Sequence, residues 1–208
     1  MKICIAVAII SYLIGSISFS VIFTKKFAGF DVRDKGSKNA GSTNVLRTAG
    51  KKVALITLLC DVLKGICAVL LAVFIGNKCN FEHTEILVQI AAFLVVFGHT
   101  FPIFFGFKGG KGVATSLGVL LLVNWKLGLI VMMYALVLIA LTRFVSLGSI
   151  AAAILTPILT IFINDCYLVD GNYFIFGVLL AIFVCYNHRA NIKRLMDGNE
   201  NRLSFNKS

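Results

Sequence analysis

The sequence VALITLLCDVLKGICAVLLAVFI occupies residues 53–75 and contains only two charged side chains, those of Asp61 and Lys64. A transmembrane α-helix needs about 20 predominantly apolar residues to cross the hydrocarbon core of a bilayer. This stretch is long enough, and a helix satisfies the backbone polar groups within its own segment, as lipid requires. Residues 53–75 are therefore predicted to form a membrane-spanning helix that carries one charged pair.

The rest of the chain has the same character. Apolar residues make up 59% of it, charged residues 14%, and the mean hydropathy is +0.93, whereas a soluble domain is about half apolar and about a quarter charged. We expect an all-α, polytopic transmembrane bundle of about seven spans, formed by a single domain over residues 1–208. The predicted spans are residues 3–24, 53–75, 85–105, 113–123, 127–142, 146–163 and 173–187. The fourth is short and the break at Arg143 is weak, which leaves five or six spans open.

Basic residues are distributed unequally between the two sets of connections. Sixteen of the 20 Lys and Arg residues lie in residues 25–52, at Lys108, Lys111 and Arg143, and in the tail after residue 187. The positive-inside rule then predicts an N-terminus outside and a C-terminus in the cytoplasm. The net charge of +11 would also suit nucleic acid, but a chain embedded in lipid offers little soluble basic surface, so no nucleic-acid partner is expected.

The six cysteines do not predict a metal site. No Cys-x-x-Cys is present and no His/Cys cluster has the spacing of a zinc site, so we expect neither a metal nor a cofactor. Cys79 and Cys166 both fall in predicted outer connections. In an oxidising compartment they could pair, and the sequence leaves open whether they do.

The first polar segment is GSKNAGSTNVLR, residues 36–47. Glycine and hydroxyl residues allow backbone and side-chain donors to face an anion, and Arg47 supplies a planar fork suited to phosphate. A solvated turn before the second span would use the same residue types. The sequence alone does not separate these two interpretations.

The second polar segment is GHTFPIFFGFKGGKGVAT, residues 98–115. It is not a P-loop, because Phe105 and Gly112 stand where that motif needs glycine and a hydroxyl residue. Even so, we expect its glycines to present main-chain N–H groups, with Lys111 just before the N-terminus of an apolar helix. A flexible, positively charged connection would account for the lysines but not for the glycines. His99 is either bonded to a neighbouring helix or lines a site.

The third polar segment is HRANIKRLMDGNE, residues 188–200. In a helix His188 and Asn191 share one face. A basic anchor for acidic lipids is the alternative, but such an anchor would not need His188. The pair Asp61 and Lys64 is interpreted as structural, supporting the site from within the membrane.

Together the three polar segments predict a shallow cytoplasmic site for an anion, most simply a phosphate. In their order, and in the length and span number of the chain, they resemble the bacterial integral-membrane acyl-phosphate:glycerol-3-phosphate acyltransferases, the PlsY family. That family transfers a fatty acyl group from acyl phosphate to the 1-hydroxyl of sn-glycerol 3-phosphate, giving lysophosphatidic acid and phosphate, the first step of phospholipid synthesis. The resemblance implies a multi-pass protein of the bacterial plasma (inner) membrane that uses neither acyl-CoA nor acyl carrier protein. One departure is Lys38, where the family usually has glycine.

The resemblance also implies roles for individual residues. The expected catalytic residues are Ser37, Arg47, Lys111, His188 and Asn191. The expected substrate-binding residues are Gly36, Asn39, Thr43, Asn44, His99, Lys108, Gly109, Gly110 and Gly112. Glu200 is expected to stabilise the tail. The rival functions are a small membrane transporter of an organic phosphate and a non-catalytic lipid-binding scaffold. A transporter of this kind is expected to show an internal sequence repeat and a binding site near the midplane of the bilayer.

Overall fold

The structure is a computed structural model and describes residues 1–163 and 172–203. Within these ranges every regular element is a helix, as the composition predicts. The α-helices are α1 (Lys2–Gly15), α2 (Phe19–Ala28), α3 (Ser42–Ala49), α4 (Lys51–Lys78), α5 (Thr84–Thr100), α6 (Val113–Val123), α7 (Trp125–Thr142), α8 (Val145–Phe162), α9 (Phe174–Asn187) and α10 (Arg189–Met196). Two short 3-10 turns, η1 (Val32–Asp34) and η2 (Ile103–Phe105), lie in the connections.

Each of the seven predicted spans is helical, but not all of them are long enough to cross a membrane alone. Five described segments are long and apolar enough to cross a membrane: Lys2–Ala28, Lys51–Lys78, Thr84–Phe105, Trp125–Thr142 and Val145–Phe162. A sixth results if α9 and α10, bent by 63° at their junction, are counted together. Helix α6 has only 11 residues. The chain is thus an all-helical membrane protein with five or six candidate spans, and seven stays a prediction.

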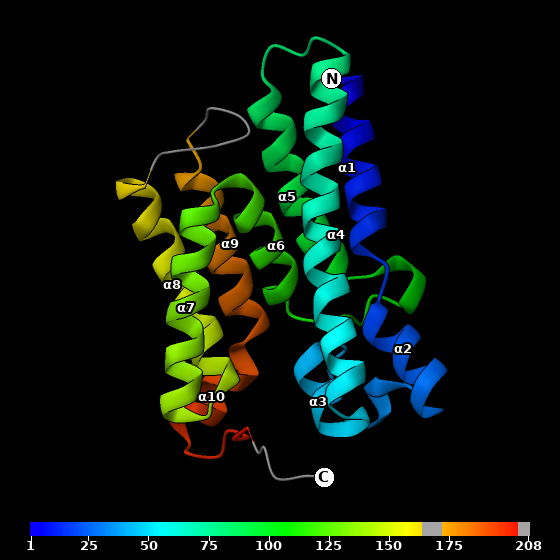
Figure 1. Ribbon diagram of the computed structural model, residues 1–208, viewed down its shortest axis with the longest axis vertical. Helices are drawn as coiled ribbons and strands as arrows, with labels where there is room; N and C mark the ends of the chain where they lie inside the picture. The colour runs from blue at the N-terminus through cyan, green and yellow to red at the C-terminus, as the bar shows by residue number, and fades with distance from the viewer. Residues whose placement is uncertain (164–171, 204–208) are drawn as a thin grey trace.

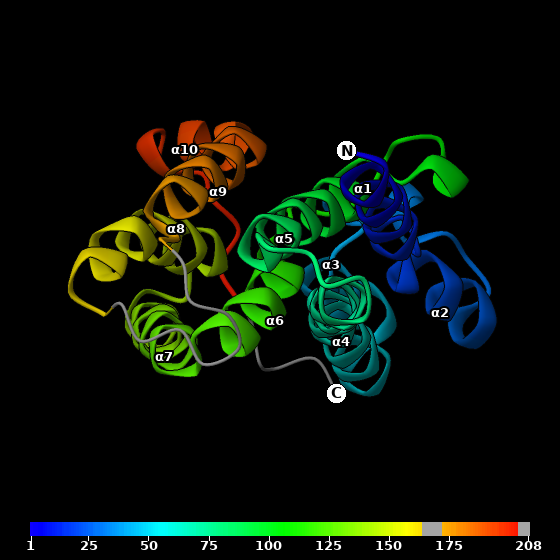
Figure 2. The ribbon, with the colours of Figure 1, turned by 90° about the horizontal axis from the view of Figure 1, so that it is seen from above.

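The helices form two groups. Helices α1, α4 and α5 pack together, α7, α8 and α9 form the second group, and α6 contacts both α4 and α7 (Figures 1 and 2). Helices α2, α3 and α10 all lie at one end of the molecule, the end opposite the N-terminus (Figure 1). Helices α3 and α10 carry parts of the first and third polar segments, which therefore lie at the same end.

Close packing of α4 against α6 depends on two glycines. A Cβ atom at Gly65 would lie 2.4 Å from the carbonyl oxygen of Thr115, and one at Gly118 would lie 2.0 Å from that of Val62. Small residues let helix backbones approach closely in membranes, where apolar packing against lipid gives little driving force. This contact fixes the N-terminus of α6, which follows the second polar segment.

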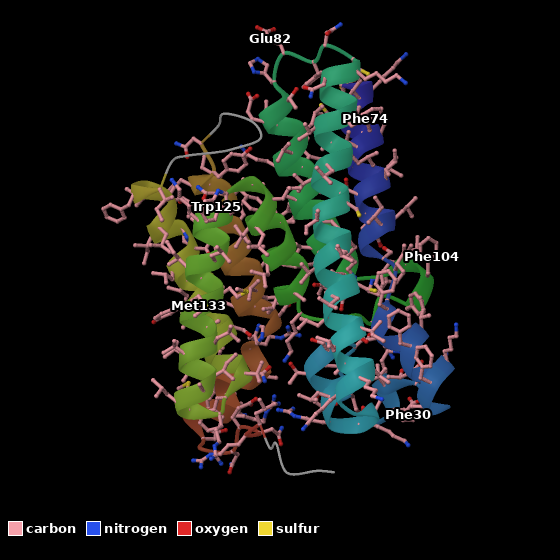
Figure 3. The ribbon with its side chains drawn as sticks, in the orientation of Figure 1. Phe30, Phe74, Glu82, Phe104, Trp125 and Met133 are labelled. Atoms are coloured by element: carbon pink, nitrogen blue, oxygen red, sulfur yellow. The ribbon has the colours of Figure 1, made fainter. Side chains whose placement is uncertain are left out.

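Apolar side chains cover the outside of the bundle. Phe74 and Met133 are more than half exposed and point outward from α4 and α7 (Figure 3). Only 17% of helix α7 is buried inside the protein. An apolar surface of this extent suits contact with lipid rather than water.

Most of the basic connections gather towards one end, as the charge count predicts. Figure 3 places Phe30 at this end and Glu82 at the other. The connection between α2 and α3, the end of α7 and the tail lie at the Phe30 end, whereas the connection before α6 lies nearer the middle of the long axis (Figure 1). Cys79 is an exposed free thiol, and Cys166 lies outside the described residues, so whether the two pair stays open.

The first predicted span is not one continuous helix. It breaks between α1 and α2, leaving backbone carbonyl groups without helical partners. The ammonium group of Lys64 donates to the carbonyl oxygens of Gly15 (3.1 Å) and Ile17 (3.0 Å), and lies 2.8 Å from Asp61 Oδ1. The predicted structural pair in α4 is therefore present, and it also closes a helix break that the apolar pattern of residues 3–24 did not reveal.

Candidate active site

Asn44 organises the first polar segment. Its side-chain oxygen accepts from the backbone N–H of Ser37 (2.9 Å), and its amide donates to the carbonyl oxygens of Val32, Lys35 and Asn39, each at 3.0 Å. The side chain is only 2% exposed. Because all of its polar atoms are engaged with backbone, the predicted contact between Asn44 and substrate would require one of these bonds to break.

The turn around Ser37 contains two residues with left-handed backbone. Gly36 has φ +59° and Lys38 has φ +58°. A non-glycine residue adopts this region at a cost of about 1–2 kcal/mol. The position where the resemblance predicts glycine is therefore one where the backbone favours glycine. Ser37, between these two residues, is exposed.

The second polar segment folds back onto the end of α5. Gly109 N–H donates to the carbonyl oxygen of Thr100 (3.1 Å), and Gly110 N–H donates to that of His99 (3.0 Å). These two donors are occupied by protein, which differs from the prediction that they face an anion. A Cβ at Gly109 would lie 2.1 Å from the carbonyl oxygen of His99, so close approach of backbone to α5 accounts for the glycine there.

Lys111 and the N-terminus of α6 are the other groups at this loop that can bind an anion. Gly112, with φ +88°, is the N-cap of α6. The first N–H groups of any α-helix lack partners within the helix and carry partial positive charge. Lys111 thus lies beside a helix N-terminus, as predicted, and its Nζ donates to Asn191 Oδ1.

The third polar segment forms the bend between α9 and α10. His188 is 3% exposed, and its Nδ1 lies 2.8 Å from the carbonyl oxygen of Val184. A carbonyl oxygen can only accept, so Nδ1 carries a proton and the lone pair of the neutral ring is on Nε2. The side chain of Asn191 also donates to Glu200 Oε1 (2.8 Å).

Glu200 holds the tail against the bundle. Its carboxylate accepts from Asn191 Nδ2, Arg194 Nε (2.8 Å) and Ser146 Oγ (3.1 Å). Burial opposes ionisation of this group, but the hydrogen bonds from Asn191 and Arg194 outweigh it and hold the pKa of Glu200 below its ordinary value. The bonds support the stabilising role expected for Glu200. Sequence reasoning did not find its partners Ser146 and Arg194.

Three contacts join the polar segments pairwise. Ala40 N–H donates to the carbonyl oxygen of Gly109 (3.3 Å), linking the first to the second. Lys111 bonds to Asn191, linking the second to the third. Arg47 Nη2 donates to the carbonyl oxygen of Asn201 (3.2 Å), linking the first to the residue after the third. Segments up to 154 residues apart therefore form one centre.

The centre is strongly cationic. Burial, reinforced by nearby Arg194, lowers the pKa of Lys111 to about 8. Burial also lowers the pKa of Arg47 from its ordinary value, with Glu200 acting in the opposite direction, and Arg keeps its charge under physiological conditions. Two partly desolvated cations, which Glu200 neutralises only in part, favour an anionic ligand.

Not every predicted site residue is joined to this centre. Asn39 Nδ2 reaches the carbonyl oxygen of Gly109 at 3.5 Å, which is a marginal bond. Thr43 is half-buried at the start of α3, and Lys108 lines an open groove outside the contacts that join the three segments. The groove is formed by Asp31, Arg33, Asp34, Lys38, Phe105, Gly106 and Lys108.

Sequence reasoning missed a clamp beside this groove. Arg33 Nη2 lies 2.7 Å from Asp31 Oδ2, and Arg33 Nη1 donates to the carbonyl oxygen of Phe105 (2.6 Å). The hydrogen bond from Arg33 outweighs burial and holds the pKa of Asp31 well below its ordinary value. The Asp-x-Arg spacing at residues 31–33 was the available signal, and the clamp fixes the first polar segment to the loop before α6.

The whole arrangement matches a known family. The family model described as "Glycerol-3-phosphate acyltransferase" matches residues 5–198. The chain belongs to the glycerol-3-phosphate acyltransferase family. A family member from Clostridioides difficile (strain 630) is 43% identical over 207 residues, covering 98% of this chain and 97% of that protein. One from Syntrophomonas wolfei is 41% identical over 199 residues, covering 96% of each.

Solved structures of the glycerol-3-phosphate acyltransferase family have the same fold. PlsY (YgiH), an integral membrane glycerol 3-phosphate acyltransferase, superposes in its glycerol 3-phosphate form with a TM-score of 0.84 at 34% identity, covering 97% of this chain and 96% of that chain. Its lysophosphatidic acid form gives 0.81 at 33% identity, covering 97% and 95%. The predicted family membership is therefore confirmed, together with the integral-membrane helical fold.

Proposed function

We propose that the protein transfers a fatty acyl group from acyl phosphate to the 1-hydroxyl of sn-glycerol 3-phosphate. The products are 1-acylglycerol 3-phosphate (lysophosphatidic acid) and inorganic phosphate, at the first step of phospholipid synthesis. The observation that carries the proposal is the pairwise joining of the three polar segments into one cationic centre. Both substrates carry phosphate, so such a centre suits each of them.

In the proposed reaction one acyl bond replaces another. The glycerol oxygen attacks the acyl carbon, the bond from that carbon to the phosphate oxygen breaks, and the electron pair leaves with phosphate. His188 Nε2, whose lone pair is free because Nδ1 donates to Val184, takes the proton of the hydroxyl. Departing phosphate is the other available acceptor. A mixed anhydride already has a good leaving group, so no covalent enzyme intermediate is required.

Arg47 and Lys111 are proposed to bind phosphate oxygens, with Ser37 and the N-terminus of α6 as further donors. Asn191 has two amide hydrogens, and Glu200 accepts a hydrogen bond from one of them. The other is proposed to bond the glycerol or the oxyanion that develops at the acyl carbon. Gly36, Thr43, Gly109, Gly110 and Gly112 are proposed to shape the substrate pocket.

The protein is proposed to act in the inner membrane of a bacterium, with its N-terminus outside and the cationic centre facing the cytoplasm. The gathering of most basic connections towards one end of the bundle supports this orientation under the positive-inside rule. The proposed donor is acyl phosphate, without acyl-CoA or acyl carrier protein.

One assay tests the proposal. Purified protein in lipid is given palmitoyl phosphate and glycerol 3-phosphate, and both phosphate and lysophosphatidic acid are measured. Equimolar formation of the two products is expected, with none when palmitoyl-CoA replaces the acyl phosphate. Uptake of glycerol 3-phosphate into vesicles without product formation would instead support a transporter and refute the enzyme.

A further inference from the structure

His99 lies in the last turn of α5, between a buried ion pair and the glycine loop. Its side chain is almost completely buried, with Nδ1 3.4 Å from Asp61 Oδ1. The opposite edge of the ring faces Gly110, where a Cβ atom would lie 2.0 Å from His99 Nε2. The imidazole is thus held between α4 on one side and the loop on the other.

The side of the ring that faces α4 is rigidly held. Asp61 is 1% exposed and Lys64 is 4% exposed. The Lys64 ammonium has three hydrogens and three acceptors in reach: Asp61 and the carbonyl oxygens of Gly15 and Ile17. The ammonium is held by α1 and its break through these two carbonyl oxygens, and it forms an ion pair with the carboxylate that faces His99.

The side of the ring that faces the loop leads directly to the cationic centre. Gly110 N–H donates to the carbonyl oxygen of His99, and Gly109 N–H donates to that of Thr100. The next residue, Lys111, bonds to Asn191. The ring and these two backbone bonds together hold the loop at its distance from α5, directly before Lys111.

We propose that His99 is a positioning residue for acyl transfer: its imidazole, anchored by Asp61, sets the height of Gly110 and thereby the place of Lys111. The inference rests on the proposed function. It favours the first of the two interpretations of His99, since one ring nitrogen faces Asp61 on α4 and the other faces Gly110.

A double-mutant cycle tests the contact between ring and loop. Gly110→Ala should raise the KM for glycerol 3-phosphate by about 10²-fold, the scale of losing one hydrogen bond from a charged group to the substrate. His99→Asn keeps an amide near Nδ1 for Asp61 but removes the Nε2 edge, and should raise KM about tenfold. The double variant should be no worse than Gly110→Ala alone, because the new methyl group finds the space that the ring vacated.

Gly109→Ala is the matched control. Its Cβ meets the carbonyl oxygen of His99 at 2.1 Å, which is backbone and is unchanged by His99→Asn. The increase in KM caused by Gly109→Ala should therefore differ by less than about threefold between the native protein and the His99→Asn variant. If His99→Asn reduced the increase in KM equally for both alanine variants, the inference would be overturned, because that result would indicate a general loosening of the loop.

The split between KM and kcat distinguishes positioning from stability. His99→Asn should leave kcat within about threefold, whereas partial unfolding would lower kcat and leave KM unchanged, and that result would overturn the inference. The thermal unfolding midpoints of the native protein, the two single variants and the double variant give a second measurement that does not depend on activity. Additive midpoint shifts would refute the His99–Gly110 contact, whereas a native protein that made no lysophosphatidic acid would refute the proposed function.

Discussion

The charge of Lys111 should make acyl transfer fall on the alkaline side of a pH profile. Burial, with Arg194 as a second cause, lowers the pKa of Lys111 from its ordinary value of 10.5 to about 8. The ammonium is therefore present below about pH 8 and is lost as the pH rises through that value. If it binds phosphate in the transition state, kcat/KM should fall about tenfold per pH unit, leaving about a tenth of the activity at pH 9.

The two kinetic parameters should respond at different pH values. The profile of kcat/KM reports groups in the free enzyme, and that of kcat reports groups in the complex. A bound phosphate favours the charged form of a neighbouring ammonium and raises the pKa of Lys111. The alkaline fall of kcat should therefore lie at higher pH than that of kcat/KM.

The assay measures lysophosphatidic acid at constant ionic strength from about pH 6.5 to about 10, with an enzyme-free blank at each pH. Lys111→Arg is the matched variant, because a guanidinium keeps its proton throughout this range. Its maximal rate should be lower, since a planar fork replaces a point charge, but its alkaline fall should be absent. A flat kcat/KM profile for the native protein, or an unchanged alkaline fall in Lys111→Arg, would refute the reasoning.

Three further predictions concern single side chains. Arg47→Ala should lower kcat/KM by about 10²-fold or more through loss of a phosphate-binding cation, whereas Arg189→Ala, at an exposed position, should change it less than about twofold; similar losses in both would contradict a specific site. Glu200→Ala should lower the free energy of unfolding by about 2 kcal/mol, because it leaves buried donors without an acceptor; an equal effect of the exposed Asp197→Ala in thermal unfolding would count against this. Lys38→Gly should raise the free energy of unfolding by at most about 1 kcal/mol by removing left-handed strain, and a lower midpoint would show that the strain is absent.

Much of the candidate site follows from residue types in short segments. Arg47, Lys111 and His188 stand out because polar residues are rare in a chain that is 59% apolar. The shared face of His188 and Asn191 follows from helical spacing. The partners of Glu200 could not be predicted in this way, because Ser146 lies 54 residues away and nothing in either local sequence indicates the other.

The glycine loop shows where local reasoning fails. Glycines before a helix favour an anion-binding loop with free N–H groups, and nothing in the sequence contradicts that. The structure directs the N–H groups of Gly109 and Gly110 to the carbonyl oxygens of Thr100 and His99. Which partner a donor takes depends on how closely the loop approaches α5, and that distance is a property of packing.

The membrane location, the helical class and the three polar segments followed from sequence alone, since a long apolar run in lipid has a helix as its only way to satisfy backbone groups within itself. The break between α1 and α2, the support of His99 by Asp61, and the meeting of Arg47 and Lys111 with the tail were decided by the tertiary structure. These features depend on contacts between residues far apart in the chain. Such contacts form only when helix packing brings the segments together, and local pattern carries no record of that geometry.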